Sequence, residues 1–321
     1  MAKAPSPLAK VLGLCLLAIL LGVTIGESIP STTPGQLRPP PGASPKQCSR
    51  DCASCARRPP EEKSLAKRVF ENPWDPRFGN TINYVAYAIS MAEQVQIYPM
   101  DGMSYSIARA EALQNVPFKL VIGHLQGCVV VVIVSRWGLY MSHHWEVPSL
   151  SRGNWLPADE TIFKEQVLDE LRFGGGQDMP NLPQFIYEDG PFAAQYHPKA
   201  YVFMRRATSR PNYDRLYQDK VIKIADTVAK ITGLETSIDA YDNSWNESPD
   251  DPDPSSIVRG KIVFEYDPDG LGDICKAAMS RLWVEDKIAY HDEWAPLESQ
   301  TGQNSDAGDL GSDGMDLDSN S

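Results

Sequence analysis

The spacing of apolar residues divides the middle of the chain, from about residue 65 to 295, into alternating helical and strand-like segments. Apolar side chains recur at helical intervals at Tyr217, Val221, Ile224, Val228 and Ile231. This spacing predicts a helix with one buried stripe over residues 213–232. Further helices are predicted over 81–96, 104–114, 159–172 and 274–285, and strands over 118–123, 128–135, 139–145, 200–205, 236–241 and 257–266.

One predicted strand differs from the others because it is apolar at every position from Val129 to Val134. Such a strand is covered on both faces, so we expect it at the centre of a sheet or between two layers. Helices come first along the chain, then three strands, then mixed elements. This order favours an α+β fold, with a largely antiparallel sheet or sandwich flanked by helices, in a single domain over residues 65–296.

The two ends of the chain differ in composition from this middle part. Lys3 and Lys10 precede an uncharged run over residues 11–26, which is typical of a secretory signal peptide over residues 1–26. An uncleaved signal-anchor is the alternative. Residues 27–64 are rich in proline and predict an extended linker, whereas residues 297–321 are Gly, Ser, Asn and Asp and predict a disordered acidic tail. We therefore expect a secreted protein.

The net charge of −12 comes mainly from two acidic runs, residues 241–254 and the tail. The remainder is close to neutral, so no basic patch indicates nucleic-acid binding. No stable membrane association is expected once the signal is cleaved. Asn246 begins an Asn-Glu-Ser acceptor sequence in the first acidic run, which predicts glycosylation if the producing cell glycosylates.

The cysteines support the same extracellular setting. Loss of Cys15 with the signal leaves five, and an odd number in a secreted protein leaves at least one thiol unpaired. Disulfide candidates are Cys48, Cys52, Cys55 and Cys275, with Cys128 left free, although the sequence does not determine the pairing. The first three also have the spacing of an iron–sulfur ligand set, but the proline-rich surroundings and the predicted signal favour disulfides. We expect no metal and no cofactor.

Cys128 begins the all-apolar strand, and His143 and His144 end the next one. Ser135, Arg136, Trp137 and Gly138 interrupt the two strands and predict a tight hairpin turn. In such a hairpin Cys128 faces His144 or its immediate neighbour. Opposed residues have Cβ atoms roughly 5 Å apart, so a thiol and an imidazole would meet. Adjacent strand residues point to opposite faces, so only one of the two histidines shares the face of Cys128.

The order Leu125-Gln126-Gly127-Cys128 followed by His143 or His144 resembles the cytotoxic necrotizing factor family of bacterial toxin deamidases. More loosely, it is similar to the chemoreceptor glutamine deamidases. In these families a Leu-Ser-Gly-Cys-type motif precedes the nucleophile strand, and the catalytic histidine lies on the adjacent strand. The resemblance covers about 20 residues of 321 and departs from the family at Gln126, where serine is usual. It implies hydrolysis of glutamine side-chain amides on a protein target.

The chemistry that this pattern predicts is nucleophilic catalysis through a thioester. A neighbouring imidazolium would stabilise the Cys128 thiolate, and backbone N–H groups near Gly127 and Cys128 would hold the oxyanion. His144 fits the hairpin register slightly better, whereas His143 matches the spacing of the family. His124 is a further pocket candidate.

Two other functions remain open at this stage. Cys128 is a core residue if the chain is a secreted binding or interaction protein without catalysis, because buried cysteines in apolar strands are common. A cysteine acyltransferase or transglutaminase would use the same thioester and pass the acyl group to an amine. The enzyme hypothesis predicts a reactive Cys128, whereas the binding hypothesis predicts an inert one.

Overall fold

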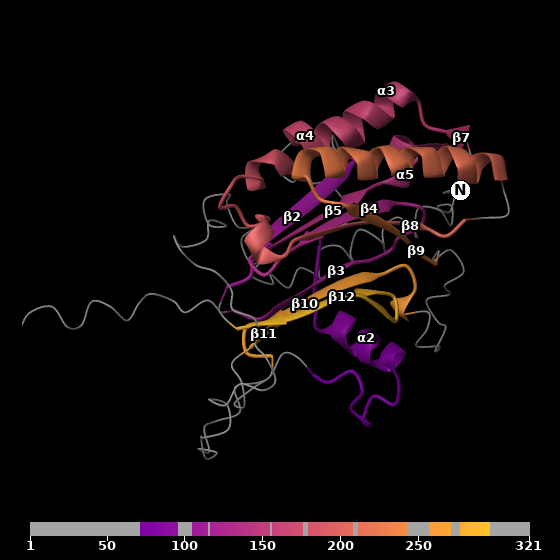
Figure 1. Cartoon of the computed structure of the whole chain (residues 1–321). Helices are drawn as coiled ribbons and strands as arrows, with labels where there is room; N and C mark the ends of the chain where they lie inside the picture. The colour runs from indigo at the N-terminus through magenta and orange to yellow at the C-terminus, as the bar shows by residue number, and fades with distance from the viewer. Residues whose placement is uncertain are drawn as a thin grey trace, which may run out of the picture. The chain divides into compact units, whose positions relative to one another are not determined.

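Two five-stranded sheets carry the fold in the computed structural model, which describes residues 71–95, 105–114, 116–154, 156–175, 179–207, 211–242, 257–270 and 277–295. The first sheet has the order β1-β3-β10-β11-β12, with β1 (Glu93–Gln94), β3 (Phe118–Ile122), β10 (Ile262–Asp267), β11 (Ala278–Val284) and β12 (Lys287–Trp294). The second has the order β2-β5-β4-β8-β9, with β2 (Ser106–Ala112), β5 (Gly138–His144), β4 (Val129–Val134), β8 (Lys199–Arg205) and β9 (Thr236–Tyr241). Figure 1 shows the two sheets one above the other.

Helices cover the outer face of the second sheet (Figure 1). The helical segments on this side are α3 (Glu160–Phe163), η3 (Lys164–Asp169), α4 (Glu170–Phe173), η4 (Leu182–Phe185), η5 (Ala194–Tyr196) and the long α5 (Pro211–Thr232). The predicted stripe of α5 is buried, with Tyr217, Val221, Ile224 and Val228 at most 2% exposed. Asp159 caps α3 by accepting a hydrogen bond from the backbone N–H of Thr161. The short η2 (Glu146–Leu150), β6 (Ser151–Gly153) and β7 (Leu156–Pro157) connect β5 to α3.

The core between the two sheets depends on β4, as its sequence predicts. Val130, Val132 and Val134 pack against the first sheet, whereas Val129, Val131 and Ile133 pack under the helices. All six are fully buried. The expectation of a central strand covered on both faces is therefore confirmed, because β4 lies between β5 and β8 with a layer on either side.

The outer face of the first sheet is covered by α2 (Thr81–Ser90) through a buried ionic network. The fully buried Glu265 carboxylate accepts hydrogen bonds from Lys119 Nζ at 2.8 Å, Tyr84 Oη at 2.8 Å and Trp283 Nε1 at 2.7 Å. The Arg281 guanidinium lies 3.4 Å from the same carboxylate. A carboxylate buried with this many donors is satisfied, so the network holds α2 on the sheet.

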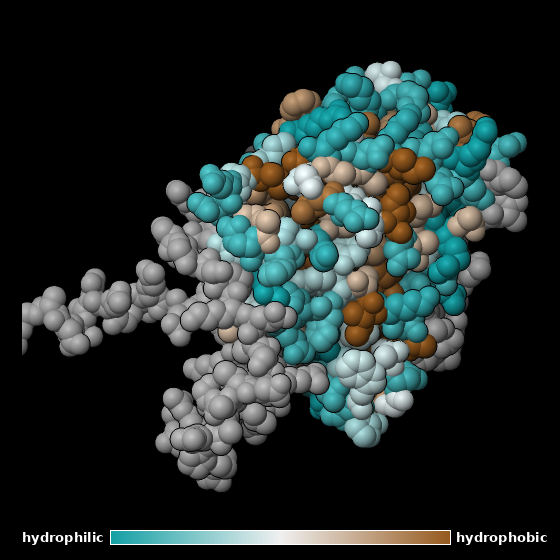
Figure 2. Space-filling model, viewed as in Figure 1, coloured by the Kyte–Doolittle hydropathy of each residue, from teal (hydrophilic) through white to brown (hydrophobic). Residues whose placement is uncertain are grey.

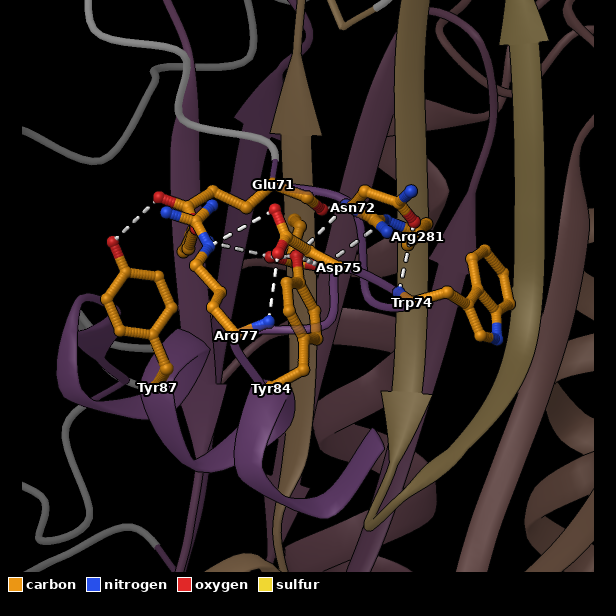
Figure 3. A network of polar contacts seen from close by, with 10 residues as sticks. Glu71, Asn72, Trp74, Asp75, Arg77, Tyr84, Tyr87 and Arg281 are labelled. Carbon is orange, nitrogen blue, oxygen red and sulfur yellow. Dashed lines mark hydrogen bonds and ion pairs between the residues drawn. The ribbon is translucent and has the colours of Figure 1, made fainter. Parts of the chain in front are cut away.

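This network continues into the segment that precedes α2 (Figure 3). Arg281 donates to the backbone carbonyl of Glu71 at 3.1 Å and to Tyr84 Oη at 3.0 Å. The Glu71 carboxylate pairs with Arg77 and accepts a hydrogen bond from Tyr87 Oη. These polar contacts therefore hold the segment that precedes α2 in place.

The α+β fold with largely antiparallel sheets is confirmed, since parallel pairing is confined, among the described strands, to β1 with β3 and β8 with β9. Five of the six predicted strands are present with small shifts at their ends, and the sixth, predicted over 257–266, begins at Ile262. Strand β12 was not predicted.

Two predicted helices are wrong. Residues 104–114 contain β2, which pairs with β5 at seven positions, and residues 274–285 contain β11, between β10 and β12. Arg109 and Glu111 form an ion pair two residues apart, which strand geometry allows and a helix face does not. In β11, Leu282 joins the core between the sheets while Trp283 packs against α2. Burial on two faces overrode the helical preference of these alanine-containing segments.

Exposed apolar side chains do not form one continuous surface on the face seen in Figure 2, where brown patches are interrupted by hydrophilic residues. Trp74, Phe173 and Val116 are the most exposed large apolar residues described. Scattered apolar residues of this kind are usual on protein surfaces. Within the described ranges, no helix has the length and apolar character needed to cross a membrane.

Candidate functional site

The hairpin of β4 and β5 sets the relation between Cys128 and the two histidines. Its register pairs Val129 with His144 and Val130 with His143. One residue further, Cys128 stands opposite Trp145, the immediate neighbour of His144. Because alternate residues share a face, His143 lies diagonally across on the face of Cys128, and His144 lies on the other face. Diagonal neighbours are roughly 7–8 Å apart, within reach of a ring.

The His143 imidazole is buried on the face of Cys128. It is 2% exposed, and its Nε2 atom has no hydrogen-bond partner among the described residues. The ring stacks on Trp145, with 4.6 Å between ring centroids. No hydrogen bond joins this ring to the Cys128 sulfur in the described part of the chain.

His144 belongs to a polar cluster on the helical side of the sheet. Its Nδ1 lies 2.7 Å from Ser106 Oγ and its Nε2 lies 3.0 Å from Ser142 Oγ. Ser106 Oγ also donates to the backbone carbonyl of Gln166. Both ring nitrogens are thus engaged, which is the pattern of a structural histidine.

Two tyrosines hold the backbone on either side of the Cys128 nitrogen. Tyr241 Oη donates to the carbonyl of Cys128 at 2.6 Å and accepts from the N–H of Gly127 at 3.3 Å. Tyr217 Oη donates to the carbonyls of Gly127 at 2.8 Å and Cys128 at 3.2 Å. Gly127 has a φ of 118°, a conformation that L side chains rarely adopt. The backbone entering β4 is therefore fixed from α5 and β9.

A carboxylate approaches the same turn. Glu146, the first residue of η2, lies so close to Gly127 that a Cβ at position 127 would collide with its carboxylate. The absence of a side chain at Gly127 is thus what admits Glu146. Sequence reasoning did not select Glu146, Tyr217 or Tyr241 as site residues. Tyr217 was expected only as part of the buried stripe of α5.

Burial keeps the nucleophile and both histidines uncharged. Burial raises the pKa of the Cys128 thiol to about 11, hydrogen bonding from the backbone N–H groups of Glu146 and Gln126 opposes this rise, and the Glu146 charge adds to it. Burial lowers the pKa of His143 and of His144 to about 3. A thiolate–imidazolium pair is strongly disfavoured in this state. Both pKa shifts oppose the expected imidazolium beside a resting thiolate.

A pocket of about 230 Å³ is lined in part by Tyr217. The Tyr217 hydroxyl also donates hydrogen bonds to the carbonyls of Gly127 and Cys128. The lining residues come from the end of β8, the first turns of α5 and β9: Met204, Arg205, Arg206, Ala207, Asp214, Tyr217, Gln218 and Ala240. The predicted pocket candidate His124 is exposed, has a φ of 55°, and does not line this pocket.

The remaining site predictions lie outside the described residues. These are the disulfide candidates Cys48, Cys52, Cys55 and Cys275, and the glycosylation candidate Asn246. Cys128 carries a free thiol. In the described ranges, no group of three or more His, Cys, Asp or Glu side chains has the arrangement needed to hold a metal ion.

Comparisons with known proteins leave the family of the chain open. No family model matches it, and no curated protein matches its sequence. Among solved structures, the C-terminal domain of CNFy from Yersinia pseudotuberculosis matches with a TM-score of 0.24 and 14% identity, over 58% of this chain and 57% of that chain. The chain thus spans little more than half of that domain, and a TM-score of this size supports no conclusion about family or activity.

Proposed function

We propose that the chain is a cysteine hydrolase of side-chain amides, acting on glutamine in a protein, with Cys128 as nucleophile and His143 as general base. The supporting observation is the buried Nε2 of His143, which lies on the face of Cys128 and has no hydrogen-bond partner among the described residues. Leaving a buried polar atom unpaired costs about 1–3 kcal/mol. A proton acceptor kept in this condition beside a free thiol is typical of a catalytic group.

The proton moves as the new bond forms, because both groups start neutral. The Cys128 thiol gives its proton to His143 Nε2 while the sulfur attacks the amide carbon. The tetrahedral intermediate collapses, the C–N bond breaks, and the imidazolium protonates the departing ammonia. Water then loses a proton to His143 and attacks the thioester, which releases glutamate and regenerates the thiol.

Backbone N–H groups around the sulfur supply the oxyanion site in this proposal. Those of Gln126, Cys128 and Glu146 hydrogen-bond to the sulfur and lower the pKa of the thiol. The Gly127 N–H is donated to Tyr241 instead. Because C=O and N–H point in opposite directions across a trans peptide, the bond from Tyr217 to the Gly127 carbonyl orients the Cys128 N–H. Preorganised donors of this kind contribute much of the catalysis of acyl transfer.

Secretion with cleavage of the signal over residues 1–26 is part of the proposal, and rests on the sequence pattern alone. Disulfides among the remaining cysteines and glycosylation at Asn246 are proposed on the same basis.

The proposal is tested with a glutamine analogue that carries a chloromethyl ketone at the position of the side-chain amide. Cys128 displaces chloride and becomes alkylated, which is measured on the tryptic peptide 120–136, where Cys128 is the only cysteine. We expect saturable labelling that is at least tenfold slower in His143→Ala and nearly unchanged in a folded His144→Ala variant. Equal rates in wild type and His143→Ala would exclude His143 as the base.

The alternative is a binding protein in which Cys128 only packs. It is favoured by the 7% exposure of Cys128 and by its place in the apolar core between the sheets. This alternative predicts no saturable labelling by the glutamine analogue and no difference between wild type and His143→Ala.

A further inference from the structure

Trp145 shares one face of the hairpin of β4 and β5 with both residues of the proposed catalytic pair. It continues β5 in an extended conformation, with φ −66° and ψ 143°, so it lies two residues beyond His143 on the same face. The register that pairs Val129 with His144 places Trp145 directly opposite Cys128. Opposed side chains have Cβ atoms roughly 4.5–5.5 Å apart, which brings the indole and the thiol together at this end of the hairpin.

The indole packs directly against the His143 ring. The two ring centroids are 4.6 Å apart and the ring planes meet at 31°. Trp145 also packs against the apolar core between the sheets, to which Cys128 belongs. Its backbone N–H donates to the Tyr105 carbonyl at 3.0 Å, which anchors the chain at this point. The indole can therefore move by rotation of the side chain alone, while the strand stays in place.

The three side chains on this face differ in exposure. Cys128 is 7% exposed and His143 is 2% exposed, whereas Trp145 is only partly buried. Neither the thiol nor the imidazole can meet a glutamine side chain until a covering group moves. Moving a partly exposed ring disturbs the packed core less than moving a buried one. Trp145 is thus the member of the three whose displacement opens the site.

Burial also keeps both reacting groups uncharged. The pKa of His143 is lowered to about 3 and that of the Cys128 thiol is raised to about 11. Other titratable groups reach this end of the sheets from several elements: His144 on β5, Glu146 in η2, Tyr217 on α5 and Tyr241 on β9. Burial is the cause of the lowered His143 pKa, so water that reaches the ring raises it.

We propose that Trp145 positions the His143 ring and shields it and the Cys128 thiol from water, until a protein substrate moves the indole aside. This inference rests on the proposed function of Cys128. The stacked indole fixes the orientation of the imidazole. When the indole leaves, water and the substrate amide reach both groups, so the imidazole becomes a stronger base and the thiol a stronger acid. The free protein is thus kept nearly inactive, and the substrate itself completes the site.

The direct test is the pKa of His143 in variants of Trp145. Isotope-labelled histidine is followed by NMR from about pH 8 to about pH 4.5, and His143→Ala identifies the signal. Wild-type His143 should stay neutral over this range. In Trp145→Ala its pKa should rise to above about 5, toward the ordinary value near 6.5, because water then reaches the ring. Trp145→Phe should stay close to the wild type, since it keeps a stacked aromatic ring.

Two controls separate this effect from a general loosening of the fold. Trp137→Ala removes the indole at the opposite end of the same hairpin, where it is partly buried and packs on Tyr196 with ring centroids 6.0 Å apart. This variant should leave the His143 pKa unchanged. His144 is an internal control, because it lies on the other face with its ring nitrogens bonded to Ser106 and Ser142. Its pKa should not rise in Trp145→Ala.

The effect on the nucleophile is measured by iodoacetamide labelling at about pH 7, in which the Cys128 sulfur displaces iodide, on peptide 120–136. Trp145→Ala should react at least about tenfold faster than the wild type, because an imidazolium beside a thiol lowers its pKa. Most of this gain should be lost when His143→Ala is added. Wider access to the sulfur alone would speed the reaction equally with and without His143.

The outcomes distinguish this inference from the proposed function. An unchanged His143 pKa in folded Trp145→Ala, or an equal rise in Trp137→Ala, overturns the shielding by Trp145 and leaves the proposed function standing. A raised His143 pKa with equal labelling in Trp145→Ala and the double variant overturns the pairing of Cys128 with His143 and the proposed function with it, although Trp145 still shields His143. If Trp145→Ala does not fold, Trp145→Leu decides: a smaller rise of the His143 pKa supports the inference, and an unchanged pKa overturns it.

Discussion

Removing one hydroxyl, in Tyr241→Phe, tests whether the backbone at Cys128 is held from β9. Tyr241 is fully buried and makes two hydrogen bonds to this turn, with the Cys128 carbonyl and with the Gly127 N–H. Phenylalanine keeps the apolar packing of the ring. The change therefore isolates the hydroxyl.

The expected destabilisation by Tyr241→Phe depends on which hydrogen bonds the Cys128 carbonyl and the Gly127 N–H keep. The Cys128 carbonyl keeps its bond from Tyr217 at 3.2 Å, so its loss is that of one ordinary hydrogen bond, about 1 kcal/mol. The Gly127 N–H loses the acceptor that the structure gives it, and an unsatisfied buried donor costs about 1–3 kcal/mol. We expect the free energy of unfolding to fall by about 2–4 kcal/mol.

The assay is urea unfolding followed by tryptophan fluorescence, with Tyr266→Phe as the control. Among the described residues the Tyr266 hydroxyl makes one hydrogen bond, at 2.6 Å to the carbonyl of the exposed Gln114, so its loss should cost about 1 kcal/mol. A destabilisation by Tyr241→Phe no greater than that of Tyr266→Phe would refute the double attachment of the turn.

Three further predictions concern buried charges. First, the pKa values of His143 and His144 are lowered to about 3, so the unfolded chain binds more protons than the folded chain between about pH 6.5 and 3. The free energy of unfolding therefore falls as the pH drops through that window. Urea unfolding at pH 7 and 4.5 measures this fall, and a His144→Asn variant with an unchanged pH dependence would contradict it. Second, Glu265→Gln should destabilise by about 3–5 kcal/mol, because the variant removes the buried carboxylate that faces the charges of Lys119 and Arg281. A loss below 1 kcal/mol in thermal unfolding would be inconsistent with this network. Third, the iodoacetamide reaction of native Cys128 should rise with pH with a midpoint near 11, whereas in the unfolded chain the midpoint should lie near 8.5. Equal midpoints would show that the thiol is not buried as described.

The sequence predicted the central strand and the hairpin because both depend on local pattern. The run Val129 to Val134 is apolar without alternation, and the short polar turn at Ser135 leaves few possible registers. The two wrong helices have the opposite origin. Residues 104–114 and 274–285 contain alanines and charged residues that suit a helix locally, and only pairing with distant strands makes them extended.

Only the part of the candidate site that lies on the two neighbouring strands of the hairpin was predicted from the sequence. Cys128 and His143 are close in sequence, and the hairpin register places them on one face of the sheet. Tyr217 and Tyr241 reach the Cys128 carbonyl from 89 and 113 residues away, and no periodicity indicates such contacts. Glu146 is near in sequence, but the turn that directs its carboxylate to Gly127 leaves no pattern in residue types. The charge states also depend on burial, which opposes ionisation of both the Cys128 thiol and the His143 imidazole.

The most direct test of the central claim is to trap the thioester. A panel of folded proteins with exposed glutamines is incubated with the chain, quenched in acid, digested, and searched by mass spectrometry for peptide 120–136 joined through Cys128 to a glutamine peptide that has lost ammonia. The account predicts this adduct in wild type, its cleavage by hydroxylamine, and its absence from Cys128→Ser and His143→Ala. Release of glutamine ammonia that persists in Cys128→Ser, or a wild-type Cys128 that never carries an acyl group, would contradict it.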